Sequence, residues 1–493
     1  MADNTTPQHA APPAEAAPAG RLTTSAVVFL IIAASAPLTV VAGGAPSAYG
    51  VSGMMGAPVG YLLLGIVLVF FTVGYAAMSR RITNAGAFYA YVSAGLGKRQ
   101  GIAASWLALI SYNAMQIGLY GLFGFSLSSI LGQYGLELSW WVCALIGALV
   151  VGLMGISQID LTAKIIAVLV LLEFVTVIGF NIVALINHPE AITAEPYSPS
   201  VFFGAGTGTL LAFGIAAFMG FESGTIYSEE AKDPSRTIPR ATYIAISIIA
   251  LFYSFSAWAL AQGTGNSQIV ERSATEGPDL MFNMLSDFGF AVAADIANVL
   301  FLTSLFAALI AFHNTVARYA MSMGREAVIP RYLGKQNAKL APVAGSLTQS
   351  ALAIALIIVF AIFGQGHELG PLFPVLTMFT WLTNAGAFGL VFLLVITSAA
   401  IIGYFHQHPA DHGTWVRLIA PGIAAAGLIY VFVSILLNFD VMIGSDGVTP
   451  LVVVMPALII ASGVIGWARG EYLRRSRPAV FDNIGSGHPA PMD

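Results

Sequence analysis

The sequence predicts an all-α membrane protein with twelve membrane-spanning helices, and two observations support that prediction. Of the 493 residues, 57% are hydrophobic and only 9% are charged, whereas a soluble domain carries about 25% charged residues. The apolar stretches are also long and continuous, as bilayer-spanning helices require, and lack the short alternation of barrel strands. This composition excludes a large soluble enzyme. No Walker loop, metal-ligand cluster or nucleophile elbow is present, so we expect no enzymatic activity, cofactor, metal or nucleic-acid partner.

Tails of different composition flank the apolar segments. Residues 1–20 are rich in Ala and Pro and lack an apolar core, which predicts a disordered tail and not a signal peptide. Residues 21–477 form the membrane domain, and residues 478–493 predict a second disordered tail. The loop 262–289 is expected to hold a short surface helix around Pro278–Leu285. The twelve expected spans are Ser25–Tyr49, Pro58–Met78, Gly101–Ile130, Trp140–Met154, Thr162–Ile186, Gly208–Tyr227, Ala241–Ala261, Ala291–Ala320, Val343–Phe363, Leu372–Thr397, Leu418–Leu437 and Leu451–Trp467.

The basic residues predict the orientation of these segments. If the N-terminus is cytoplasmic and the segments alternate, every one of the 20 Lys and Arg residues except Arg272 falls on the cytoplasmic side. Cytoplasmic loops carry such an excess of positive charge. We therefore expect a multi-pass protein of the inner (plasma) membrane with both termini in the cytoplasm.

Two of the twelve segments are interrupted. Pro37 lies near the middle of the first, in A-S-A-P-L, where it removes a donor and frees backbone carbonyls. The sixth is interrupted at G-F-E-S-G, residues 220–224. These are the first helices of two halves, helices 1–5 and 6–10, and such a pair indicates a transporter site. Freed N–H groups there bind a carboxylate, and freed C=O groups bind a cation or an ammonium. The alternative is a pair of ordinary kinked helices.

Three motifs resemble those of the amino acid–polyamine–organocation (APC) superfamily. They are G-F-E-S-G-T-I-Y-S-E-E-A-K-D-P-S-R-T-I-P-R-A at 220–241, N-A-G-A-F-Y-A-Y-V-S-A-G-L-G at 84–97 and A-R-Y-A-M-S-M-G-R-E-A-V-I-P at 317–330. The resemblance implies a LeuT-like fold, with 5+5 inverted repeats at about 25–186 and 208–397 and two extra helices at about 418–467. It also implies transport of amino acids or organic amines, often coupled to protons or run as exchange.

The first helix departs from the superfamily pattern. The usual G-S/T-G-I-F break is replaced by A-S-A-P-L, residues 34–38, similar to the branch of putrescine-importer-like members. Side chains at this break leave less room for a substrate carboxylate against the backbone. The expected substrate contacts are Ala34, Ser35, Ala36 and Pro37 at this break, Phe218, Gly220, Phe221 and Glu222 at the other, and Asn113 and Gln116 on one face of helix 3.

Ionisable groups at bilayer depth are costly and are functional by default. Glu222 at the second break is a candidate gate or proton-linked carboxylate, or alternatively a cap for the N–H groups of the broken helix. Glu173 lies in helix 5, nine residues beyond Lys164 and so about 13 Å deeper. In proton-coupled members of the superfamily a lysine occupies the matching position. Glu173 is a candidate to carry a proton, ligate a cation or attract an amine, with interhelical packing as the alternative.

Further polar residues lie at or near the cytoplasmic half of the segments. Asn314 and Thr315 of helix 8 match the region where sodium-coupled members of the superfamily ligate their second ion. Neighbouring His313 is expected to make an interhelical polar contact or to relay protons. At the cytoplasmic end of helix 6, the residues Glu229, Glu230 and Arg240 are expected to form a charged inner gate, with a solvated charged turn as the alternative.

These features predict a secondary active transporter of amino acids or related amines that works by alternating access and is driven by protons through Glu173 or Glu222. A sodium-coupled symporter or an amine/polyamine exchanger on the same fold is the alternative, and a non-transporting sensor is a third hypothesis. The expected partners are the substrate, the coupling ion and the lipid bilayer. The sequence leaves the oligomeric state open.

Overall fold

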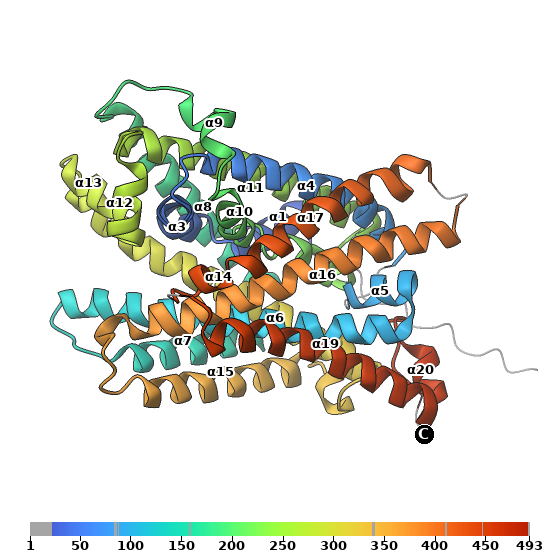
Figure 1. Cartoon of the computed structure of the whole chain (residues 1–493). Helices are drawn as coiled ribbons and strands as arrows, with labels where there is room; N and C mark the ends of the chain where they lie inside the picture. The colour runs from blue at the N-terminus through green and yellow to red at the C-terminus, as the bar shows by residue number, and fades with distance from the viewer. Residues whose placement is uncertain are drawn as a thin grey trace, which may run out of the picture.

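The computed structural model describes residues 22–82, 86, 88–156, 159–337, 341–409, 412–445 and 447–491, apart from the side chains of residues 159–163 and 229. Within these ranges the chain is helical, and its one β-type contact is an isolated bridge between Leu22 and Ala231. Long helices lie side by side in a single bundle (Figure 1). The expected all-α class is confirmed.

The observed helices follow the expected segments in order. Eleven helical runs among the described residues are long and apolar enough to cross a membrane, and Trp140–Gly155 is a shorter apolar helix at the expected fourth position. In the first half the helices are α1 (Thr24–Ser35), α2 (Pro37–Thr39), α3 (Ala45–Ser52), α4 (Ala57–Ser79), α5 (Phe88–Leu96), α6 (Lys98–Gln133), α7 (Trp140–Gly155) and α8 (Ile159–Ile186).

The second half repeats the pattern of a broken helix followed by continuous ones. Its elements are the short α9 (Pro199–Phe202), then α10 (Thr207–Ala216), the 3-10 helix η3 (Phe221–Glu230), α11 (Pro234–Thr264), α12 (Ile269–Glu276), α13 (Leu280–Asp287), α14 (Ala291–Arg325), α15 (Val343–Phe363) and α16 (Thr380–Gln407). The helices α17 (Ala420–Leu437), α18 (Phe439–Met442), α19 (Pro450–Ser476) and α20 (Pro478–Asn483) complete the chain.

The outer surface of the bundle is apolar, as a bilayer requires. On α8, for example, Val168, Leu171 and Val175 are 57–61% exposed, whereas Val170 and Glu173 are fully buried. Lipid tails do not penalise exposed apolar side chains, but they cannot satisfy an exposed carboxylate. One face of α8 therefore meets lipid while the opposite face carries Glu173 into the bundle.

The two ends of the bundle differ in character. One end, here called the arginine-rich end, holds α5, α20 and the C-terminal part of α19, and the opposite end holds α12 and α13 (Figure 1). The expected surface helix in the 262–289 loop is present as α13. Arg272, the one basic residue not expected on the cytoplasmic side, contacts Glu276 at 2.5 Å and Asp287 at 3.3 Å. The hydrogen bond to Glu276 holds the pKa of this guanidinium above its usual value.

The C-terminal tail differs from the expected disorder. Residues 478–483 form α20, and the N–H groups of Gly485 and Gly487 donate to the buried Glu326 carboxylate at 2.7 and 2.8 Å. Both glycines have positive φ, which lets the backbone turn its N–H groups onto this carboxylate. Composition alone could not anticipate this ordering because the stabilising partner lies far away in sequence. The expected N-terminal tail, 1–20, falls outside the described residues.

Candidate functional site

The first interrupted helix breaks at Ala36, which is in the left-handed region with φ 49°. This conformation costs an L-residue roughly 1–2 kcal/mol, and the surrounding contacts must stabilise it. Beyond the break, Pro37 has no N–H to donate. The Leu38 N–H donates to the Glu173 carboxylate at 3.2 Å, and the Thr39 N–H donates to the Ser304 hydroxyl at 3.4 Å. The second half of helix 1 therefore begins with its free donors already satisfied by side chains of α8 and α14.

Glu173 links the break to two other helices. Its Oε2 atom accepts from the Leu38 N–H and, at 2.7 Å, from the Ser304 hydroxyl. Its Oε1 atom is buried and has no hydrogen-bond partner among the described residues. The structure thus places Glu173 directly against the backbone of the interrupted helix.

The second interruption is centred on Gly220 and Glu222. Helix α10 ends at Ala216, and η3 starts at Phe221. The Gly220 N–H donates to both carboxylate oxygens of Glu222, at 3.1 and 3.3 Å, and the Tyr112 hydroxyl donates to the same carboxylate. Glu222 therefore caps the broken helix, which is the structural alternative considered from the sequence.

The two interruptions touch each other. Gly220 has φ 100°, and a Cβ atom at this position would lie 2.4 Å from the Cβ of Ala34. Glycine is needed here for both reasons, since a side chain would be conformationally strained and would overlap the first break. The expected juxtaposition of the breaks at residues 34–37 and 220–224 is present in the structure.

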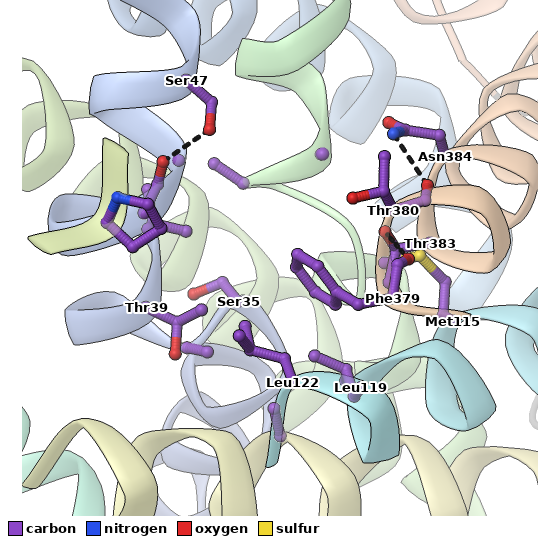
Figure 2. Close-up of a pocket in the computed structure, with 18 of the residues that line it drawn as sticks. Ser35, Thr39, Ser47, Met115, Leu119, Leu122, Phe379, Thr380, Thr383 and Asn384 are labelled. Atoms are coloured by element: carbon purple, nitrogen blue, oxygen red, sulfur yellow. Dashed lines mark hydrogen bonds between the residues drawn. The ribbon is translucent and has the colours of Figure 1, made fainter. Parts of the chain in front are cut away.

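A cavity of about 200 Å³ lies at this junction and runs toward the end that holds α12 and α13. Ser35 and Thr39 lie on one side of it, and Phe379, Thr380 and Asn384 lie on another (Figure 2). Its walls are mostly apolar. The lining residues are Ala34, Ser35, Ala36, Thr39, Val40, Gly43, Gly44, Ser47, Met115, Leu119, Leu122, Phe213, Ala216, Ala217, Pro278, Phe301, Ala308, Phe312, Val375, Phe379, Thr380, Thr383 and Asn384.

None of the described residues that line this cavity carries a charge. Of the expected substrate contacts, Ala34, Ser35 and Ala36 line it. Glu173 and Glu222 lie behind the two breaks instead. Neither carboxylate therefore lines the cavity, because both turn toward backbone N–H groups.

Several expected contacts lie elsewhere. Gln116 accepts from Gln349 and contacts His313 at 3.2 Å, and the other ring nitrogen of His313 lies 2.8 Å from the Ser346 hydroxyl. This cluster joins α6, α14 and α15. Asn113 donates to the Leu109 carbonyl of its own helix. His313 thus makes the interhelical contact considered from the sequence, and the polar face of helix 3 is directed in part at neighbouring helices.

The two phenylalanine candidates and the candidates on α14 also contact residues away from the cavity. Phe218 packs near Tyr61, with ring centroids 6.5 Å apart, and Phe221 meets Phe71 edge to face at 5.8 Å. Thr315 donates to the Ala311 carbonyl of its own helix, while Ser304 is the α14 residue that reaches Glu173. Neither phenylalanine lines the cavity. Pro37, Gly220 and Asn314 are likewise buried near the breaks or in α14 without lining it.

A buried ion pair lies between the cavity and the arginine-rich end. The Arg318 guanidinium lies 2.9 Å from a Glu230 carboxylate oxygen and 5.1 Å from the Tyr227 ring centroid, and the Arg318 side chain is 2% exposed. Strand-like hydrogen bonds tie Leu22, just before α1, to Glu230 and Lys232. Of the residues expected to form an inner gate, Glu230 belongs to this ion pair and Arg240 is exposed. The side chain of Glu229 is outside the part of the chain that the structure describes.

Sequence reasoning missed Arg318 as the partner of Glu230 and missed the α16 wall of the cavity. Thr380, Thr383 and Asn384 are spaced by three and four residues, so they share one helix face. This spacing is the sequence pattern from which a polar face on α16 could have been predicted. Arg318 lies in the motif at 317–330, and the sequence indicated only that its charge is cytoplasmic.

Comparison with known proteins places these features in a family. A sequence profile described as "Amino acid permease" matches residues 26–480. The branched-chain amino acid permease BcaP of Lactococcus lactis is 26% identical over 327 residues, which cover 62% of this chain and 67% of BcaP. The low-affinity putrescine importer PlaP of Escherichia coli is 25% identical over 395 residues, covering 76% of this chain and 80% of PlaP.

Two further comparisons extend this result. The L-asparagine permease of Streptomyces coelicolor is 20% identical, and the match covers 60% of this chain and 61% of that permease. Among solved structures, a variant of the manganese transporter of Eremococcus coleocola superposes with a TM-score of 0.50 at 13% identity, over 90% of this chain and 93% of that one. At this identity the structural likeness supports the fold alone.

Proposed function

Because this chain belongs to the amino acid permease family and is a multi-pass membrane transporter, we propose that it moves a small amino acid or related amine by proton-coupled alternating access. The observation that supports this most directly is the cavity at the junction of two interrupted helices. Transporter sites of this fold type lie at such junctions near the bilayer midplane. The relatives named for amino acid and putrescine transport agree with a substrate of this size and chemistry.

The asymmetry of the molecule supports alternating access. The cavity runs toward the end with α12 and α13, while the Arg318–Glu230 pair closes the arginine-rich end. The positive-inside rule assigns the arginine-rich end to the cytoplasm, with both termini inside. In this proposal the structure is an outward-facing state, and transport requires the ion pair to separate.

Glu173 is the residue we assign to proton coupling. It is buried at membrane depth, and one of its oxygens has no hydrogen-bond partner among the described residues. A bare charged oxygen in that position is costly, so a proton on Glu173 is favoured in this conformation. Because its other oxygen holds the Leu38 N–H, loss of the proton would change the contacts that hold the break.

Glu222 is the competing candidate, and it has a different environment. Both of its oxygens accept hydrogen bonds, from Gly220 and Tyr112. These donors offset part of the cost of burying a charge on Glu222, whereas Oε1 of Glu173 has no such donor among the described residues. This favours a capping role for Glu222 and leaves Glu173 as the proton carrier.

Flux into liposomes tests the proposed function. Purified full-length protein should accumulate labelled leucine or 3-methylbutylamine, its decarboxylated analogue, when an inward proton gradient is imposed, and a sodium gradient alone should produce no accumulation. Protein-free liposomes are the control for leak. Saturable uptake driven by sodium and insensitive to pH would replace the proton assignment with the sodium alternative. No saturable uptake of either compound, or of other small amino acids, under any gradient would contradict transport.

The inner closure gives a separate prediction. Arg318→Gln should expose the arginine-rich side, because removing one partner of a buried ion pair costs about 3–5 kcal/mol. In a Cys143→Ser background, a cysteine placed at the buried Ser223 should react with an impermeant maleimide at least about tenfold faster from the cytoplasmic side. Arg236→Gln is the matched control, since the Arg236 side chain is 75% exposed in its pair with Asp233. Equal labelling rates in both variants would show that Arg318 does not hold this closure.

A further inference from the structure

We infer that the cavity recognises a monovalent ammonium group attached to an apolar body and does not require a substrate carboxylate. This inference rests on the proposed transport function and specifies its substrate class. Its basis is the hydrogen-bond inventory of the cavity and of the two helix breaks, which leaves acceptors for a ligand and few donors.

The backbone donors at the breaks are already in use. The N–H groups of Leu38 and Gly220 bind the carboxylates of Glu173 and Glu222, and the Thr39 N–H binds Ser304. These are the groups that would hold a substrate carboxylate at a broken helix. The protein's own side chains occupy those places, so a substrate carboxylate would find these donors already in use.

The polar side chains that line the cavity also direct their hydrogens elsewhere. The hydroxyls of Ser35, Ser47, Thr380 and Thr383 donate to main-chain carbonyls at 2.7–2.8 Å. The Asn384 amide nitrogen lies 2.9 and 2.8 Å from the carbonyls of Thr380 and Met442, which accept both of its hydrogens. The Ser35 oxygen also accepts from the Tyr253 hydroxyl at 2.8 Å, because the Ser35 hydrogen is on the Ile32 carbonyl. These side chains therefore have acceptor lone pairs for a ligand, and none has a hydrogen left to donate.

Thr39 completes this inventory. Ser304 has one hydroxyl hydrogen, and it goes to Glu173 at 2.7 Å. The 3.1 Å contact between the Thr39 and Ser304 hydroxyls must then use the hydrogen of Thr39. Thr39 consequently presents only acceptor capacity toward the cavity.

The helix ends at the cavity are C-termini, and their partial negative charge favours an ammonium group. Both α1 and α10 end here, and Ser35 and Ala216, their last residues, line the cavity. The Ala34 carbonyl loses its usual helical donor because the Leu38 N–H turns to Glu173, and the Phe213 carbonyl loses its own because the Ala217 N–H turns to Gly214. Two helix C-termini carry together about one negative charge, which matches one ammonium.

The same inventory of donors, acceptors and charges distinguishes the classes of ligand that the cavity can hold. A zwitterionic amino acid places its ammonium at these ends but brings a carboxylate for which the described lining residues offer no free donor. A diamine such as putrescine brings a second ammonium into walls that carry no acidic side chain. Burying an unpaired charge is costly in both cases. A small apolar monoamine avoids both penalties.

A four-compound panel tests this inference on the purified full-length protein. The compounds are L-leucine, 3-methylbutylamine (leucine without its carboxylate), 4-methylpentanoate (leucine without its ammonium) and putrescine. Thermal stabilisation reports binding without any gradient, and each compound is also tested for proton-driven uptake. The amine should bind at least as tightly as leucine, putrescine about tenfold more weakly or worse, and 4-methylpentanoate should have no effect at the same concentrations.

The outcomes distinguish this inference from the proposed function. Uptake of leucine with no binding of 3-methylbutylamine would overturn the inference and leave the transport function standing. Binding of the amine without uptake of any compound would contradict transport and retain the inference. Equal binding of leucine and 4-methylpentanoate would show that the carboxylate is recognised, and would overturn it as well.

A substitution at Glu173 should shift the ligand preference back toward the amino acid. Glu173→Ala frees the Leu38 N–H for a ligand carboxylate, so the affinity for leucine relative to the amine should rise by about tenfold. Thr176→Val is the matched control on α8, because the Thr176 hydroxyl bonds to the Leu172 carbonyl of its own helix. An unchanged ratio in a folded Glu173→Ala protein would contradict the role assigned to Glu173. If that variant does not fold, the panel on the unmodified protein decides.

Discussion

Glu173→Gln should abolish proton-driven accumulation while leaving substrate exchange nearly intact. Glutamine has the same length, and its carbonyl can accept from the Leu38 N–H and the Ser304 hydroxyl as Oε2 does now. It cannot bind or release a proton. An inward gradient of one pH unit, which drives about tenfold accumulation when one proton moves with each neutral substrate, should then drive none, whereas counterflow exchange should fall by less than about twofold.

The comparison variant for this experiment is Glu222→Gln. It removes the second buried carboxylate but keeps its length, so it tests whether either acid suffices for coupling. We expect slower transport, because the amide NH2 group that replaces the second carboxylate oxygen would face the Gly220 N–H, donor against donor, but accumulation should still follow the pH gradient. If pH coupling is lost in Glu222→Gln and kept in Glu173→Gln, the roles of the two residues are reversed.

The fold was largely predictable because hydrophobic length determines it. The ninth segment, Val343–Phe363, is observed with the expected bounds, and the seventh begins seven residues earlier than expected, at Pro234. That earlier start is polar and lies at the arginine-rich end, where hydropathy no longer distinguishes helix from loop. The tail after Arg477 was misjudged for a similar reason, since its partner Glu326 is distant in the chain.

The candidate site was predictable only in part. Pro37 and the G-F-E-S-G stretch located both interruptions, because proline and glycine act locally on the backbone. The contact from Glu173 to Leu38 joins residues 135 positions apart, and no local pattern encodes it. Gln116 illustrates the reverse error. A polar helix face predicts a polar neighbour, but that neighbour is His313 of another helix, and Gln116 does not line the cavity.

Replacing Gly220 should have the largest effect on the architecture of the site. Gly220→Ala places a side chain on a residue with φ 100° and brings its Cβ to 2.4 Å from that of Ala34. The left-handed backbone alone costs an alanine roughly 1–2 kcal/mol, and the overlap adds to it because both atoms belong to short side chains that cannot turn away. We expect a clear fall in thermal stability and loss of uptake.

Two companion variants separate the causes of that loss. Gly224→Ala lies in the same interruption, but the one contact of its Cβ below 3 Å would be with the flexible end of Ile31, at 2.8 Å, so its effect should be much smaller. Gly220→Ala combined with Ala34→Gly removes the overlap but not the strain, and it should recover part of the lost stability. If the double variant is no more stable than Gly220→Ala, contact between the two interruptions is not what makes glycine necessary. If Gly220→Ala itself transports normally, the two helix breaks do not approach each other as closely as the structure has them, and the cavity between them must be reconsidered.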